Sequence, residues 1–160
     1  MPASRLNWLT EPLFAIAMAA LAAMALLTVA DIALRYGFHR PIGGSYEMVG
    51  FFAGASLSFV LPYLQATNGH IIVDLLVRLA SPPLAKFLRI LALAIAFLFF
   101  SLLTWRLIVN MQAIFVSGQV SDVLGIPIWS VYAIVMVGPA VTALVCLDQL
   151  AQFFTRASHS

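Results

Sequence analysis

Four long apolar stretches, each bounded by charged residues, dominate the hydrophobic pattern of the chain. A helix needs about 20 mostly apolar residues to cross the roughly 30 Å hydrocarbon core of a bilayer. Each stretch, with its flanking turns, meets this length. The pattern therefore predicts an all-α integral membrane protein with four transmembrane helices, over about residues 12–36, 46–66, 84–115 and 127–150.

A shorter segment between the second and third spans has a different pattern. His70, Asp74 and Arg78 recur at every fourth position, and the residues between them are apolar. A helix over about residues 70–80 is too short to cross a bilayer, and Pro82 follows it. A narrow polar stripe on an apolar helix favours the membrane–water interface. We therefore expect a short interfacial amphipathic helix here, in contact with phospholipid.

Small residues form a stripe along the second span, where Gly50, Gly54 and Ser58 are spaced by four. In lipid, such a stripe lets the backbone of another helix approach closely. The sequence leaves two interpretations open. The stripe either packs helices within this chain or contacts another subunit.

Charged residues near the ends of the first two spans suggest structural polar contacts. Asp31 and Arg35 lie four apart, in the favourable order of acid before base. Glu47 suits the first turn of the second helix. Unpaired charge near lipid is costly. We therefore expect Arg35 and Glu47 to tie the first two spans together near the outer surface.

Proline interrupts the second and fourth spans at similar depth, at Pro62 and at Gly138-Pro139. Paired breaks of this kind occur at transporter binding sites. Proline is also tolerated in ordinary transmembrane helices, which it kinks. Both interpretations stay open.

Composition supports the membrane class. Apolar residues make up 63% of the 160 residues and charged residues 9%, and the mean hydropathy is +1.04. So few charges cannot solvate the surface of a water-soluble domain, and disordered chains are polar and charge-rich. Four spans leave no room for a soluble domain, so we expect a single membrane domain over residues 1–160. A net charge of +2 does not suggest a nucleic-acid partner.

The distribution of basic residues indicates the orientation. Four spans place both termini on one side. That side carries five basic residues (Arg5, Arg78, Lys86, Arg89 and Arg156), and the other side carries three (Arg35, Arg40 and Arg106). The positive-inside rule then favours cytoplasmic termini. Trp105 and Arg106 together are typical of an interface, where an indole anchors and an arginine extends to water.

No catalytic or cofactor site is evident in the sequence. The acids lie near span ends, metal-ligand spacing is missing, and no nucleophile is accompanied by a base. The single cysteine, Cys146, is interpreted as a small apolar packing residue. A membrane enzyme or a self-sufficient carrier usually has ionisable residues inside the membrane, and the acids of this chain lie near the span ends instead. We therefore expect neither an enzyme nor a cofactor.

Several polar landmarks, taken together, resemble a known family. They are Asp31-Ile-Ala-Leu-Arg35-Tyr36, Gly44-Ser-Tyr-Glu47, Asn68-Gly-His70-Ile-Ile-Val-Asp74 and Leu124-Gly-Ile-Pro127-Ile-Trp129. This pattern is similar to the small membrane subunit of TRAP (tripartite ATP-independent periplasmic) transporters, the DctQ-like family. The segment before Glu47 departs from the family, which often has a Trp and a second acid there. No role of a carboxylate pair is therefore carried over.

The resemblance implies a scaffold (stator) subunit of a sodium-coupled secondary transporter in a bacterial inner membrane. The expected partners are a large multi-span TRAP membrane subunit, which moves as an elevator, and a periplasmic substrate-binding protein that delivers an organic carboxylate. Two other classes remain alternatives: a stand-alone small multidrug-type exporter, and a membrane anchor subunit of a redox complex.

Overall fold

The computed structural model describes residues 6–67 and 82–157, and these residues form four long helices. The helices are α1 (Asn7–Phe38), α2 (Ser45–Ala66), α4 (Pro82–Ser117) and α5 (Ile128–Ala157). All four are long and apolar enough to cross a membrane. The predicted all-helical fold with four spans is confirmed. The interfacial helix expected over residues 70–80 lies outside the described residues.

Local backbone chemistry sets several of the helix ends. His39 adopts a left-handed conformation after α1 (φ 55°), and its N–H donates to the carbonyl of Leu34, as in a common helix C-terminal motif. Pro82 opens α4, where a residue without an N–H costs little. α1 begins at Asn7, five residues before Pro12 (12 minus 7), and Pro12 removes one helical hydrogen bond near the start of the helix.

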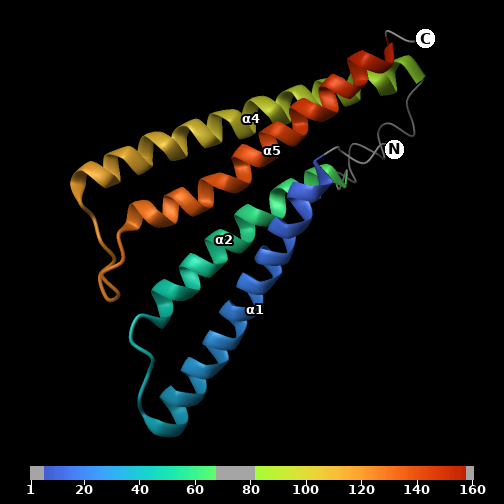
Figure 1. Ribbon diagram of the computed structural model, residues 1–160. Coiled ribbons are helices and arrows are strands. Elements are labelled where there is room, and N and C mark those ends of the chain that lie inside the picture. Colours follow the sequence, from blue (N-terminus) through green and yellow to red (C-terminus); the bar gives the residue numbers. More distant parts are fainter. Residues whose placement is uncertain (1–5, 68–81, 158–160) are drawn as a thin grey trace.

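The helices pack as a row in the order α1–α2–α5–α4 rather than as a closed bundle (Figure 1). α1 and α2 form one antiparallel hairpin, and α4 and α5 form the other. The two hairpins meet where α2 packs on α5. Within the described residues, α4 has no helix neighbour besides α5. The row therefore has two edge helices, α1 and α4.

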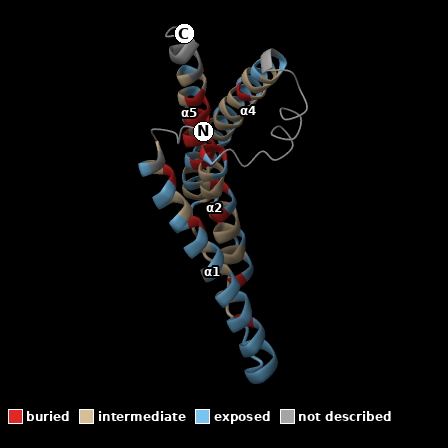
Figure 2. Cartoon of the chain, turned by 90° about the vertical axis from the view of Figure 1, so that its right-hand side faces the viewer, coloured by how far each residue is buried: buried red, intermediate tan, exposed pale blue. Residues whose placement is uncertain are grey.

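Burial follows this arrangement, as Figure 2 shows. In the most apolar part of α5, 39% of residues are buried, against 6% in α1 and in α4. A small apolar core forms near the end of α2, where Ala66 packs with Val141 and Val145 of α5. The rings of Phe14 and Tyr63 stack nearby, with centroids 4.2 Å apart, and join α1 to α2.

The connection between α4 and α5 is an ordered loop rather than a loose link. Val120 and Pro127 form an antiparallel bridge. The N–H of Ser121 donates to the carbonyl of Ile126, and the N–H of Ile128 donates to the carbonyl of Gln119. This loop of residues 118–127 folds back beside the start of α2 (Figure 1). We call it the outer loop, and the α2 end beside it the outer end, after the orientation expected from the basic residues.

Candidate functional site

The outer loop is held in place by the carboxylate of Glu47. One oxygen of Glu47 accepts the N–H of Val123 at 3.0 Å, and the other accepts the N–H of Leu124 at 3.1 Å. Gly44 lies against Leu124 so closely that a Cβ atom there would come within 2.6 Å of its side chain. Gly44 also has a positive φ of 75°, which L side chains rarely adopt. These contacts join the two helical hairpins at their loop ends.

Asp31 organises the neighbouring α1–α2 connection. Its carboxylate accepts the N–H of Ile42 at 2.8 Å and pairs with Arg35 at 2.6 Å. The structure thus differs from the expected tie between Arg35 and Glu47. Arg35 bonds within its own helix, and Glu47 bonds to the backbone of the outer loop. The contact of Glu47 with the outer loop could not be predicted, because every residue except proline has a peptide N–H and the sequence does not show which of them face Glu47.

At the middle of the molecule, the two proline-containing helices, α2 and α5, pack together close to their prolines, Pro62 and Pro139. Pro139 has no N–H to offer the carbonyl of Val135, four residues earlier. The hydroxyl of Ser58 donates to that carbonyl at 2.5 Å instead. Pro62 in turn deprives the carbonyl of Ser58 of its helical donor, and this carbonyl faces Gly138. Each proline thus leaves one carbonyl of its own helix without a helical donor, and that carbonyl faces the neighbouring helix.

The close approach of α5 to α2 requires glycine at position 138. A Cβ atom on Gly138 would lie 2.0 Å from the carbonyl oxygen of Ser58, far inside any real contact. Of the predicted stripe, Ser58 is therefore at the tightest point. Gly54 lies farther out, where a Cβ would meet Val135 at 3.4 Å, and Gly50 has nothing within 4 Å. Sequence inspection found the break at Gly138 but not its partner.

Toward the C-terminal ends of α2 and α5, two buried glutamines join the same helices. The side-chain amide of Gln65 donates to the side-chain oxygen of Gln149 at 3.1 Å, and the amide of Gln149 donates to the backbone carbonyl of Gln65 at 3.0 Å. Both side chains are buried. This pair was not predicted from the sequence, although an amide near the C-terminal end of each of two otherwise apolar spans was a signal that could have found it.

We call these contacts the α2–α5 seam: Glu47 with the outer loop, Ser58 with Val135 and Gly138, and Gln65 with Gln149. Within the described part of the chain, every buried side-chain nitrogen or oxygen has a hydrogen-bond partner. In the same residues, no group of three His, Cys, Asp or Glu side chains is placed to hold a metal ion. The seam is thus a structural joint built from satisfied polar groups.

His70, Asp74 and Arg78, the residues expected on the interfacial helix, lie outside the described residues. Their placement at the membrane surface remains a prediction.

These features define a class: a helical membrane protein of four spans, assembled as two hairpins that one polar seam connects. The comparison with family descriptions makes this specific. Residues 24–156 match the family described as tripartite ATP-independent periplasmic transporters, DctQ component. The chain belongs to this family, which supplies the small membrane component of TRAP transporters. Comparisons with curated proteins and with solved structures give no match.

Proposed function

We propose that this chain is the static small subunit of a sodium-coupled TRAP transporter that takes up an organic carboxylate. In this role it braces a large multi-span subunit, which carries the solute and moves as an elevator. The observation that carries the proposal is the α2–α5 seam, whose buried polar groups bond to one another. A seam of this kind suits a part that holds its shape while a partner moves.

The proposal has further parts, which rest on the family and on the distribution of basic residues. The whole chain, residues 1–160, acts as one membrane domain without enzymatic activity, in a bacterial inner membrane with both termini in the cytoplasm. The outer loop then faces the periplasm, where a soluble binding protein delivers the solute. Glu47 keeps the shape of that loop constant while the binding protein arrives and leaves.

Reconstitution in liposomes tests whether the large subunit transports the solute and this chain supports it. We expect liposomes with the large subunit, this chain and the loaded binding protein to accumulate the organic acid when a sodium gradient is applied. Liposomes that lack this chain, and liposomes that contain only this chain, are expected to accumulate none. Accumulation by the chain alone would contradict the proposal and favour a stand-alone exporter. Haem or quinone bound to the purified chain would instead favour a redox anchor.

A further inference from the structure

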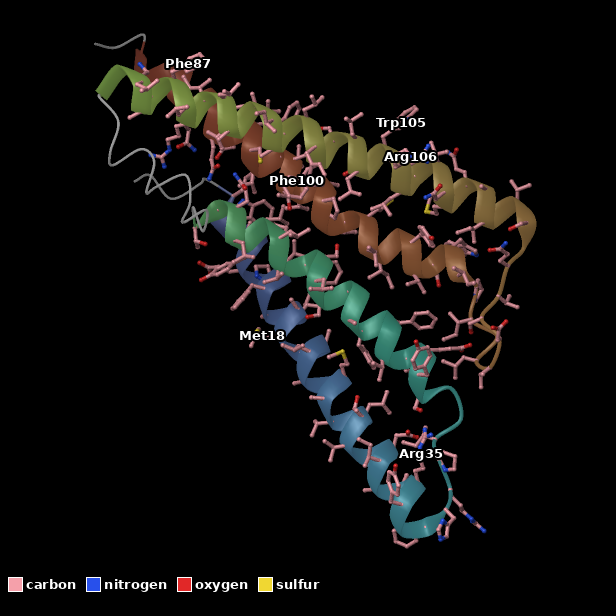
Figure 3. The ribbon with its side chains drawn as sticks, turned by 180° about the vertical axis from the view of Figure 1, so that it is seen from behind. Met18, Arg35, Phe87, Phe100, Trp105 and Arg106 are labelled. Carbon is pink, nitrogen blue, oxygen red and sulfur yellow. The ribbon has the colours of Figure 1, made fainter. Side chains whose placement is uncertain are left out.

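Arg106 lies in the interior of α4, whereas the other basic residues of that helix, Lys86 and Arg89, lie near its start. It is exposed on α4, beside Trp105, which is 65% exposed (Figure 3). Among the described residues, the ion pair joins Arg35 to Asp31, and Arg106 has neither an ion pair nor a hydrogen bond from its side chain. Its depth in the membrane therefore decides whether its guanidinium group can reach water or needs a polar partner.

The register between α4 and α5 sets the depth of Arg106. The rings of Phe115 and Trp129 meet with centroids 5.6 Å apart, at the outer ends of the two antiparallel helices. Arg106 lies nine residues before Phe115 (115 minus 106), or about 13 Å along a helix axis. Nine residues after Trp129 lies Gly138. Arg106 is thus at about the depth of the Ser58–Gly138 crossing.

α2 provides an independent measure of the membrane's extent. Its 22 residues span about 33 Å, close to the hydrocarbon thickness of roughly 30 Å. It begins beside the outer loop and ends beside Gln149. The depth of the Ser58–Gly138 crossing is therefore inside the hydrocarbon. The expectation that Trp105 and Arg106 mark an interface is not compatible with this register.

Arg106 cannot reach either membrane surface from this depth. Side chains on a helix point toward its N-terminus, which for α4 is the inner end. An extended arginine covers little more than one helical turn, about 5–7 Å, and the outer surface is about 13 Å away in the other direction. A charge held inside the hydrocarbon almost always pairs with another polar group.

Three acids of the described residues already accept hydrogen bonds from groups far from Arg106. Asp31 and Glu47 bond to backbone N–H groups at the outer end, and Asp148 accepts the amide of Gln152 near the inner end of α5. Glu11 lies in the first turns of α1 and Asp122 in the outer loop, so neither is at the depth of Arg106. Because no acid of the described residues is available at that depth, we look for the partner of Arg106 in another chain. Leu102 and Asn110 lie one turn to either side of Arg106 and are also exposed. We call these three residues the Arg106 face.

We infer that the Arg106 face of α4 binds a helix of the large membrane subunit that presents a carboxylate at mid-bilayer depth. The inference rests on the proposed function, because it needs a large membrane partner. It assigns the other edge helix, α1, to lipid. The exposed apolar side chains of α1, such as Leu26 at 71% exposure, suit that assignment.

Co-purification of this chain with a tagged large subunit tests the inference. Arg106→Leu removes the charge, and Arg106→Lys keeps it. We expect Arg106→Leu to lower the affinity for the large subunit by about 30-fold or more, since it leaves a buried carboxylate unpaired. Arg106→Lys is expected to retain most of the complex. The isolated Arg106→Leu chain in detergent should be as stable as the parent chain, because it loses no internal contact.

A matched pair of bulky substitutions tests the face without changing charge. Leu102→Trp lies on the Arg106 face and Leu26→Trp lies on α1, and both positions are exposed. We expect Leu102→Trp to reduce co-purification and Leu26→Trp to leave it unchanged. The opposite result would place the partner on α1 and overturn the inference, as would full co-purification of Arg106→Leu.

Cysteine cross-linking identifies the occupant. With Leu102→Cys, we expect cross-links to the large subunit. Cross-links only to a second copy of this chain, or none in a complex that forms normally, would overturn the inference. Failure of the parent chain to co-purify with the large subunit would instead refute the proposed function.

Discussion

Gly138→Ala tests the closest contact in the molecule. The added Cβ atom would lie 2.0 Å from the carbonyl oxygen of Ser58, whereas ordinary contacts of such atoms begin at 3.4 Å. The obstacle is backbone, so no side-chain rotation relieves it. α2 and α5 must therefore separate by about 1.4 Å (3.4 minus 2.0). This separation also breaks the bond from Ser58 to the carbonyl of Val135.

Gly50→Ala provides a matched control, because nothing lies within 4 Å of that position. Both substitutions replace a helical glycine by alanine, so the gain in helix propensity of about 1 kcal/mol cancels between them. The difference consists of overpacking, typically about 1–3 kcal/mol, and one hydrogen bond between membrane helices, about 0.6 kcal/mol. We expect Gly138→Ala to be less stable than Gly50→Ala by about 2–4 kcal/mol.

The measurement is unfolding of the chain in detergent micelles by titration with a denaturing detergent, followed by far-ultraviolet circular dichroism. Gly54→Ala extends the series. Its Cβ would meet Val135 at 3.4 Å, an ordinary contact, so its stability should match that of Gly50→Ala, whereas the larger Gly54→Leu should disrupt packing. Equal stability of Gly138→Ala and Gly50→Ala would refute the close approach of α5 to α2 at Gly138 and Ser58.

Three further predictions concern the polar contacts of the seam. Glu47→Gln should destabilise the chain by about 1–3 kcal/mol, because an amide offers one oxygen to two N–H groups; an unchanged unfolding midpoint would contradict this. Gln65→Leu and Gln149→Leu should each destabilise, and the double variant should lose less stability than the sum of the two, since their mutual hydrogen bonds can be lost only once; additive losses in a double-mutant cycle would argue against the pair. Ser58→Ala should lose stability that Pro139→Ala restores, because alanine supplies the missing N–H to Val135; absence of such rescue would show that the hydroxyl does not serve that carbonyl.

Hydrophobic pattern alone predicted the membrane class and the four helices. Each span has its own continuous apolar run, and the requirement that backbone groups be satisfied within the bilayer makes such a run a helix. The motif around His70 and Asp74, with the segments near Arg35, Glu47 and Trp129, was specific enough to indicate the family, which the match over residues 24–156 then showed. These features are local in the sequence.

The partners of the polar residues could not be predicted in the same way. Glu47 bonds to residues 76 and 77 positions away, and the Gln65–Gln149 pair is separated by 84. Spacing rules for one helix say nothing about which residue of a distant helix lies opposite. Arg35 and Glu47 looked complementary because both lie near the outer ends of adjacent spans, yet backbone N–H groups compete for carboxylates and carry no sequence signal.

The sequence by itself determined which segments enter the membrane and to which family the chain belongs, because both depend on composition and short motifs. Only the tertiary structure decided the order α1–α2–α5–α4, the contact of Ser58 with Gly138, and the register of α4 against α5. In lipid, the buried and exposed faces of a helix are equally apolar, so hydrophobicity does not select the neighbour. Close packing of small residues and pairing of polar groups do so, and both depend on register between distant segments.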